Sequence, residues 1–275
     1  MRVAAIQLAV TDGHTKRDRL SRVKSILSTL GREEAPPELV LLPELWGAGF
    51  FTFDNYARDS EPAEGETYVE LSPWAERLGC YLLAGSIVER DGERLYNTAL
   101  LVDPRGRLIA KYRKMHLFGY QSEEAKILSP GDSVCVVGTE HGVWGITTCY
   151  DLRFPELYRV MVERGAQVFL VVSAWPLSRL NHWLLFNQTR ALENQTYLVS
   201  CNCAGTLAGT AFAGHSMVVD PQGVAIARGG EGEAVVWGDV LLEKVKESRA
   251  LFPALHDRRI LLDSEVASVP TPPGT

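Results

Sequence analysis

Three residues of reactive type, Glu44, Lys114 and Cys149, each follow a short apolar segment of the chain. Residues 143–148 form an apolar, β-prone run that stops at Cys149, and a helix is expected to begin near Pro155. A cysteine where a buried strand turns into a helix can project its sulfur into a crevice, facing the N–H groups of the turn. A free cysteine is also often a small core residue, so this position alone leaves both interpretations open.

Glu44 and Lys114 occupy comparable positions. The apolar run 39–42 predicts a strand covered on both faces, and Glu44 follows it after one proline. A carboxylate at such a strand end either emerges at the surface or belongs to an active site. Lys114 follows the expected strand 108–112 and is either an ordinary snorkelling side chain or a buried ammonium that serves a site.

The composition restricts the class of protein. The chain has 275 residues, of which 46% are hydrophobic and 23% charged, so it can bury a large core. With a net charge of −6 and scattered basic residues, neither nucleic acid nor an anionic membrane is an expected partner. No apolar run has the length of a membrane span, and the first residues are typical of a strand rather than a signal peptide.

The cysteines and histidines do not suggest a metal site. Five cysteines are an odd number without the spacing of a disulfide framework, which favours a reducing cytoplasm. Cys201 and Cys203 form the one close pair, and no second pair completes four ligands. The six histidines show no metal-binding motif, so we expect neither a metal nor another cofactor.

Strands and helices alternate along the chain, and no linker separates two halves. Apolar strands flanked by helices predict one α/β domain with two sheets face to face and helices outside. Ser72-Pro73 predicts a break between two short helices, because proline removes a helical hydrogen bond. Residues 119–131 and 204–214 are expected to be loops. The expected helices are 15–30, 66–78 in two parts, 155–164, 180–195 and 240–252, and the expected strands are 2–8, 39–42, 81–89, 95–102, 108–112, 143–148, 168–173, 196–203, 215–219 and 234–240.

The three reactive residues occur in the contexts Leu-Pro-Glu44-Leu, Tyr-Arg-Lys114-Met-His-Leu-Phe and Cys149-Tyr-Asp-Leu-Arg-Phe-Pro-Glu156. This pattern resembles the nitrilase superfamily of carbon–nitrogen hydrolases, from Arg2 to about Leu262. The resemblance implies an α-β-β-α sandwich, with two mixed sheets face to face, which usually assembles as a four-layered homodimer. It implies one hydrolase domain over 1–262, and we expect an extended tail over 263–275.

The resemblance also implies catalytic roles. Cys149 would be the nucleophile and Glu44 the general base, whereas Lys114 and the backbone N–H of Tyr150 would hold the oxyanion. Glu124 falls where amidases of this family carry a second active-site glutamate. Because Glu123 is adjacent, a one-residue slip in alignment would exchange the two, and by default both belong to a solvated loop surface.

The segment after the nucleophile suggests the substrate. Tyr150-Asp-Leu-Arg-Phe154 resembles amidases that act on ω-amides, whereas enzymes that hydrolyse nitriles tend to have Trp-Glu there. Residues 173–176, 190–195, 201–203 and 212–216 look like bacterial 2-oxoglutaramate amidases of the methionine-salvage type. The resemblance therefore implies hydrolysis of the terminal amide of a small ω-amido acid by water. Alternatives within the same superfamily are an amidase that acts on deaminated glutathione or on an aliphatic amide and, less readily, a nitrilase. Alternatives from other classes are a catalytically inactive binding protein on this fold and a metal-dependent hydrolase.

Four residues are candidates for binding the substrate. Arg153 could bind a carboxylate through its planar guanidinium, or it could form a structural ion pair with Asp151 or Glu156. Phe118, Tyr120 and Trp175 could wall a small pocket, or they could be core aromatics.

Overall fold

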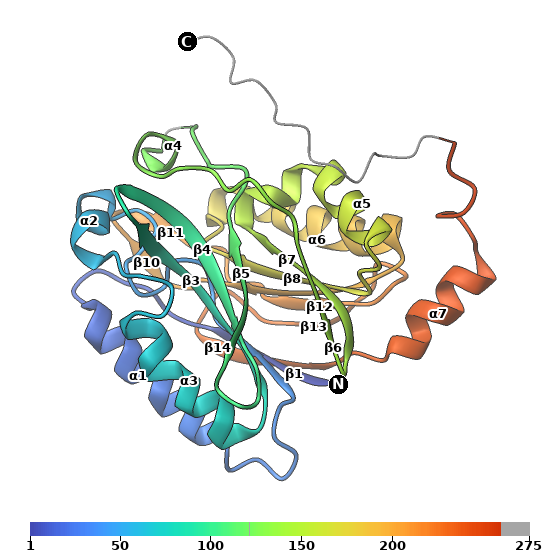
Figure 1. Ribbon diagram of the computed structural model, residues 1–275, viewed down its shortest axis with the longest axis horizontal. Coiled ribbons are helices and arrows are strands. Elements are labelled where there is room, and N and C mark those ends of the chain that lie inside the picture. The colour runs from blue at the N-terminus through green and yellow to red at the C-terminus, as the bar shows by residue number, and fades with distance from the viewer. Residues whose placement is uncertain (121, 260–275) are drawn as a thin grey trace.

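The computed structural model describes residues 1–120 and 122–259 and arranges them as two mixed β-sheets between two layers of helices (Figure 1). The first sheet has the order β14-β1-β2-β3-β4-β5, and the second has the order β13-β12-β9-β8-β7-β6. The first contains β1 (Arg2–Gln7), β2 (Leu39–Leu41), β3 (Tyr81–Asp91), β4 (Arg94–Val102), β5 (Leu108–Arg113) and β14 (Ala234–Asp239). The second contains β6 (Cys135–Thr139), β7 (Gly142–Thr148), β8 (Val168–Ser173), β9 (Tyr197–Asn202), β12 (Met217–Val219) and β13 (Ala225–Arg228). A small hairpin joins β10 (Thr206–Leu207) to β11 (Thr210–Ala211).

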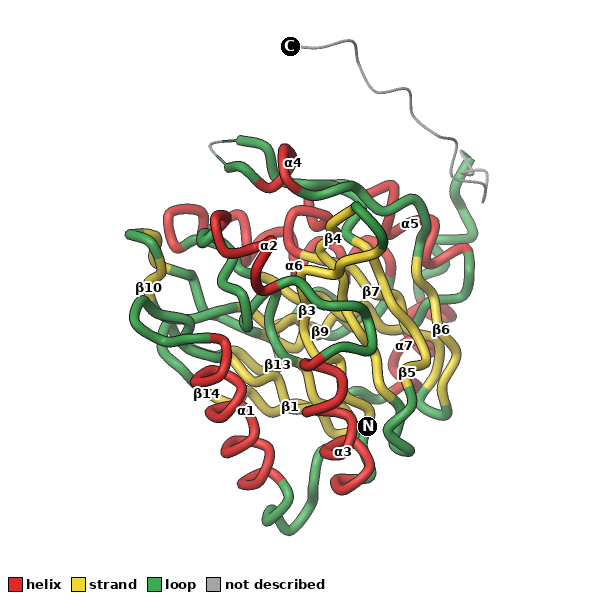
Figure 2. The backbone as a smooth tube through the Cα atoms, turned by 60° about the vertical axis from the view of Figure 1, so that its left-hand side comes forward, coloured by secondary structure: helices red, strands yellow, loops and turns green. Residues whose placement is uncertain are grey.

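Helices cover the outer face of each sheet. Figure 1 shows α1 and α3 on one side of the two sheets and α5 and α6 on the other. The rotated view in Figure 2 places α1 and α3 side by side. The helices are α1 (Lys16–Leu30), α2 (Tyr56–Asp59), α3 (Glu66–Leu78), α4 (Glu124–Ile127), α5 (Pro155–Glu163), α6 (Leu180–Asn194) and α7 (Leu242–Leu251), with 3₁₀ turns at Phe53–Asn55, Cys149–Arg153 and Leu177–Arg179.

The central strands are buried on both faces, so successive residues enter different cores. In β1, Val3 enters the core between the two sheets, whereas Ala4 enters the core beneath α1 and α3. In β8, Leu170 enters the central core and Phe169 the core beneath α5 and α6. The unbroken apolar character of these strands follows from this arrangement.

The parallel strands of both sheets have their carboxyl ends on the same side of the molecule. Strands β1, β2 and β3 are parallel to one another, as are β7, β8 and β9. Just after β2, the backbone N–H of Glu44 donates to the carbonyl of Ser173, the last residue of β8, at 3.3 Å. The two sheets therefore meet where Glu44 and Cys149 leave their strands.

The predicted break at Pro73 is wrong, because α3 is one continuous helix. Its buried side consists of Thr67, Leu71 and Ala75, whereas Pro73 is exposed. The proline leaves the carbonyl of Val69 without a helical donor, and the Val69 side chain is 60% exposed, so water can reach this part of the helix. The packing of the opposite side holds the two turns together.

Other differences concern short elements. Strands β6 and β13 are not predicted, because neither is fully buried and each lies at an edge of its sheet. The predicted loop 119–131 contains α4, and the predicted loop 204–214 contains the β10–β11 hairpin. The predicted tail over 263–275 lies outside the described residues. Within 1–120 and 122–259, no helix is long and apolar enough to cross a membrane.

Candidate active site

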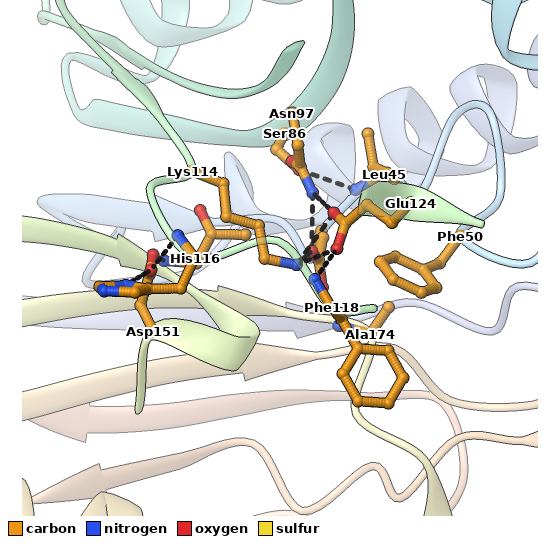
Figure 3. A network of polar contacts seen from close by, with 12 residues as sticks. Leu45, Phe50, Ser86, Asn97, Lys114, His116, Phe118, Glu124, Asp151 and Ala174 are labelled. Carbon is orange, nitrogen blue, oxygen red and sulfur yellow. Dashed lines mark hydrogen bonds and ion pairs between the residues drawn. The ribbon is translucent and has the colours of Figure 1, made fainter. Parts of the chain in front are cut away.

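Lys114 lies between two carboxylates, and all three side chains are fully buried. Its Nζ donates to Glu44 Oε1 at 2.9 Å and to Glu124 Oε1 and Oε2 at 3.0 and 2.9 Å. Figure 3 shows the ammonium pointing into this cluster. The structure thus places Glu124 beside Lys114, whereas Glu123 is exposed and pairs with Lys126. The default interpretation of both acids as a solvated surface is wrong for Glu124, because α4 turns that side chain inward.

Asn97, a residue that the sequence analysis does not identify, connects the two carboxylates. It is fully buried on β4, and its Nδ2 donates to Glu44 Oε1 at 2.7 Å and to Glu124 Oε1 at 2.9 Å (Figure 3). The backbone carbonyl of Asn97 accepts the backbone N–H of Lys114 at 2.8 Å. Asn97 therefore fixes both acids through its side chain and, through its backbone, the strand end that carries the lysine.

Backbone donors complete the orientation of the carboxylates. The N–H of Ala174, just after β8, donates to Glu44 Oε2 at 2.8 Å. The N–H of Phe118 donates to Glu124 Oε2 at 2.7 Å. Because Ala174 follows the second sheet and Glu44 the first, this contact couples the two sheets at the site.

Burial and charge act in opposite directions on these groups. Burial alone would lower the pKa of Lys114, but the charges of Glu124 and Glu44 outweigh it and raise the pKa above its ordinary value. The lysine is therefore an ammonium at neutral pH. Burial raises the pKa of Glu124, although the Lys114 charge opposes that shift.

Cys149 is held in a strained conformation at the end of β7. Its φ is +48°, a left-handed value that is costly for a residue with a side chain. It opens the 3₁₀ turn Cys149–Arg153, and the first N–H groups of such a turn have no partner within it. Burial, followed by the charge of Glu44, raises the pKa of the thiol, so the resting group is protonated. For this sulfur to act as a nucleophile, a base would have to accept its proton, and the Glu44 carboxylate that acts on the thiol is a candidate.

Asp151 has a structural role in the same turn. It is fully buried and accepts from Tyr112 Oη at 2.7 Å and from the backbone N–H of Thr148 at 2.9 Å. It also accepts from the backbone N–H of His116 at 3.1 Å, and its Oδ1 lies 2.7 Å from His116 Nδ1 (Figure 3). These contacts join the strand end carrying Lys114 to the turn carrying Cys149.

A small pocket opens beside Cys149. It contains about 340 Å³ of empty space, a figure that includes the open solvent at its mouth. Phe118, Tyr150, Arg153 and Trp175 line it, whereas Tyr120 does not. The residues that line the pocket but were not predicted to do so are Phe50, Phe51, Ala174, Pro176 and Arg179.

Arg153 forms no ion pair with Asp151, Glu156 or any other acid of the described residues. Its guanidinium lies over the rings of Trp175 and Phe186, 5.1 and 5.2 Å from their centroids, and one of its nitrogens is 3.2 Å from His182 Nδ1. The structural ion pair considered above is therefore not formed. Within 1–120 and 122–259, no group of three or more His, Cys, Asp and Glu residues is arranged to hold a metal ion.

The two adjacent glutamates provide a matched pair of variants. We expect Glu124→Gln to lower kcat/KM about 10- to 150-fold, because hydrogen bonds to a charged group contribute about 1.5–3 kcal/mol each. Glu123→Gln should change it less than about 5-fold, since exposed ion pairs contribute about 0–1 kcal/mol. Steady-state ammonia release from both variants, with circular dichroism as a check of folding, tests this. Equal losses would contradict the assignment of Glu124.

Comparison with known proteins extends these observations. A family model described as carbon-nitrogen hydrolase matches residues 2–250. The chain is 36% identical over 265 residues to the 2-oxoglutaramate amidase of Paenarthrobacter nicotinovorans, covering 94% of this chain and 89% of that protein. It is 36% identical over 268 residues to the omega-amidase NIT2 of Homo sapiens, covering 94% and 95%. The crystal structure of Saccharomyces cerevisiae Nit3, a member of branch 10 of the nitrilase superfamily, matches with a TM-score of 0.86 and 31% identity, covering 94% of this chain and 97% of Nit3. This match confirms the predicted fold class.

Proposed function

Because the chain belongs to the carbon-nitrogen hydrolase family, as its motifs predicted, we propose that it hydrolyses the terminal amide of a small ω-amido acid. A substrate of the 2-oxoglutaramate type would yield a dicarboxylate and ammonia. The observation that carries the substrate assignment is Arg153, a guanidinium without an acidic partner among the described residues, in an aromatic pocket beside Cys149. The names of the relatives, 2-oxoglutaramate amidase and omega-amidase, support the same class.

In the first half of the proposed reaction, the Cys149 sulfur attacks the amide carbon and Glu44 accepts the thiol proton. The resulting tetrahedral intermediate carries a negative oxygen. Glu44 then returns the proton to the departing nitrogen, which leaves as ammonia while the acyl group remains as a thioester on Cys149. The protonated resting thiol agrees with a mechanism in which deprotonation accompanies attack.

In the second half, Glu44 accepts a proton from water, and the hydroxide attacks the thioester. Collapse of the second tetrahedral intermediate releases the carboxylic acid, and the sulfur recovers its proton from Glu44. Water is the only reactant needed besides the amide, and each cycle converts one amide and one water into a carboxylate and ammonia.

Lys114 and the N–H of Tyr150 would stabilise the oxyanion in both halves. An ammonium in a dry site acts strongly on a developing charge, because little water screens it. Glu124 and Glu44 together hold this ammonium in position. Asn97 fixes the two carboxylates relative to each other, because its side-chain amide donates to both. This arrangement keeps one carboxylate available to the thiol while the second balances charge.

We further propose a cytoplasmic homodimer. Leu185 and Leu192, seven residues apart on α6, are 63% and 55% exposed, and a partner surface would cover them. The five free cysteines of the chain fit a reducing compartment.

Ammonia release across a substrate panel tests the proposed function. We expect 2-oxoglutaramate and succinamate to exceed butanamide in kcat/KM by about 10- to 150-fold, because a charge-assisted contact contributes about 1.5–3 kcal/mol. Butanamide is the matched control, since it has the amide and chain but no carboxylate. A preference for butyronitrile, or for glutamine, would contradict the assignment.

A further inference from the structure

Arg179 places a second guanidinium in the pocket that contains Arg153 and Cys149. It is the last residue of the 3₁₀ turn Leu177–Arg179 and directly precedes α6. It forms no ion pair with any acid in residues 1–120 and 122–259, and the first turn of α6 contains no acidic residue. Its charge is therefore available to a ligand.

A closed set of aromatic contacts holds the two guanidinium groups. Arg179 lies 5.6 Å from the ring centroid of Phe118, and Phe118 packs edge-on against Tyr150 at 5.2 Å. Tyr150 and Trp175 in turn lie 5.8 and 5.1 Å from the Arg153 guanidinium. The Trp175 indole N–H completes the set by donating to the backbone carbonyl of Arg179 at 2.9 Å.

The charges of the two arginines act on one another. Burial lowers the pKa of Arg153, and the positive charge of Arg179 lowers it further, although Tyr150 opposes this. Two like charges held in one small pocket repel each other, so an anionic or electron-rich ligand that contacts both relieves this repulsion.

We propose that Arg153 and Arg179 form a two-guanidinium subsite that selects ω-amides carrying a carboxylate beside a 2-oxo group and rejects those carrying an α-ammonium. Arg153 binds the carboxylate, and Arg179 donates hydrogen bonds to a carboxylate oxygen and to the oxygen of the neighbouring ketone. An α-amino acid amide such as glutamine places an ammonium where the ketone would lie and meets two positive charges. Arg179 is thus a specificity residue, and this inference rests on the proposed function.

Arg179→Gln tests the subsite through ratios of kcat/KM. We expect the ratio of 2-oxoglutaramate to butanamide to fall about 10- to 150-fold, the loss of one charge-assisted contact. The ratio of 2-oxoglutaramate to glutamine should fall at least as far, because glutamine also escapes one repulsive charge. Arg179→Lys keeps the charge but not the planar fork and should recover part of both ratios. Arg32→Gln, an exposed position, controls for net charge.

Binding provides a second readout that does not depend on turnover. In Cys149→Ala protein, calorimetric titration with 2-oxoglutarate should give a Kd that Arg179→Gln raises about 10- to 150-fold, with a smaller change for glutamate. The inference would be overturned if Arg179→Gln lowered kcat/KM equally for 2-oxoglutaramate, butanamide and glutamine. It would also be overturned if the variant left both the kcat/KM ratios and the Kd for 2-oxoglutarate unchanged. If the wild-type enzyme does not cleave 2-oxoglutaramate, the proposed function fails, and the 2-oxoglutarate titration still decides the role of Arg179.

Discussion

Replacing Cys149 with alanine abolishes ammonia release and leaves the fold intact: this is the largest effect that the structure leads us to expect. Loss of the nucleophile from a hydrolase costs a factor on the order of 10⁶ in kcat. The change removes the buried thiol and its contacts with Glu44 and Ser173, but the hydrogen bonds that join Lys114 to Glu44 and Glu124 remain. Ammonia release and circular dichroism on the same preparation measure activity and folding separately.

Cys80→Ala is the matched control. Cys80 is also a buried free cysteine, but it packs in the core beneath α1 and α3 and does not line the pocket. Its variant should retain ammonia release, with a modest loss of stability. A wild-type sample given a slow amide should gain the mass of the acyl group on the peptide that contains Cys149. Continued ammonia release from Cys149→Ala would exclude the thioester mechanism.

Lys114→Met should reduce both activity and stability. Removing one oxyanion donor costs about 10²–10³ in rate. Removing one partner of a buried ion pair costs about 3–5 kcal/mol in the free energy of unfolding, because the remaining charge is uncompensated. Here two buried carboxylates, Glu44 and Glu124, lose their shared cation. Urea unfolding followed by fluorescence measures the stability, and ammonia release measures the activity.

The stability loss of Lys114→Met should depend on pH. Burial already raises the pKa of Glu124 in the presence of the ammonium, and removal of the ammonium raises it further. A carboxyl with a raised pKa in the folded state binds its proton more tightly there, so folding gains stability as the pH falls through that value. The variant should therefore lose less stability at about pH 5 than at about pH 8. Lys126→Met, which removes an exposed lysine, is the control. A pH-independent loss would contradict the buried ion-pair interpretation.

The local sequence is sufficient to predict the central strands and to place the reactive residues at their ends. Strands β2 and β8 are apolar throughout because both of their faces are buried, and that composition is visible without a structure. Glu44 and Cys149 stand at the ends of such strands, so their positions at an edge could be inferred. Their proximity was an expectation from family resemblance, because it depends on how two sheets pack.

Other parts of the site depend on tertiary contacts that no local pattern encodes. Glu123 and Glu124 are identical in type, and the direction of a one-turn helix decides which one is buried. Asn97 lies in a hairpin strand, where a polar residue usually faces solvent. Arg179 lies just before the predicted helix 180–195, and its position in the pocket, without an acidic partner among residues 1–120 and 122–259, depends on the packing of distant segments. Pro73 misled the helix prediction because the packing of the opposite helix face outweighs the lost hydrogen bond.

The candidate site lies where the strand ends of both sheets meet, and this sets a lower limit on the size of an active fragment of the chain. Strands of the first sheet position Glu44, Asn97 and Lys114, whereas strands of the second position Cys149 and the Ala174 amide. A fragment that ends before β6 would contain Glu44, Asn97 and Lys114 without Cys149 and without β14, the edge strand of the first sheet. The remaining fragment would contain Cys149 and β14 without those three residues. We therefore expect that neither fragment alone releases ammonia, because the proposed site needs residues from both sheets of the closed sandwich.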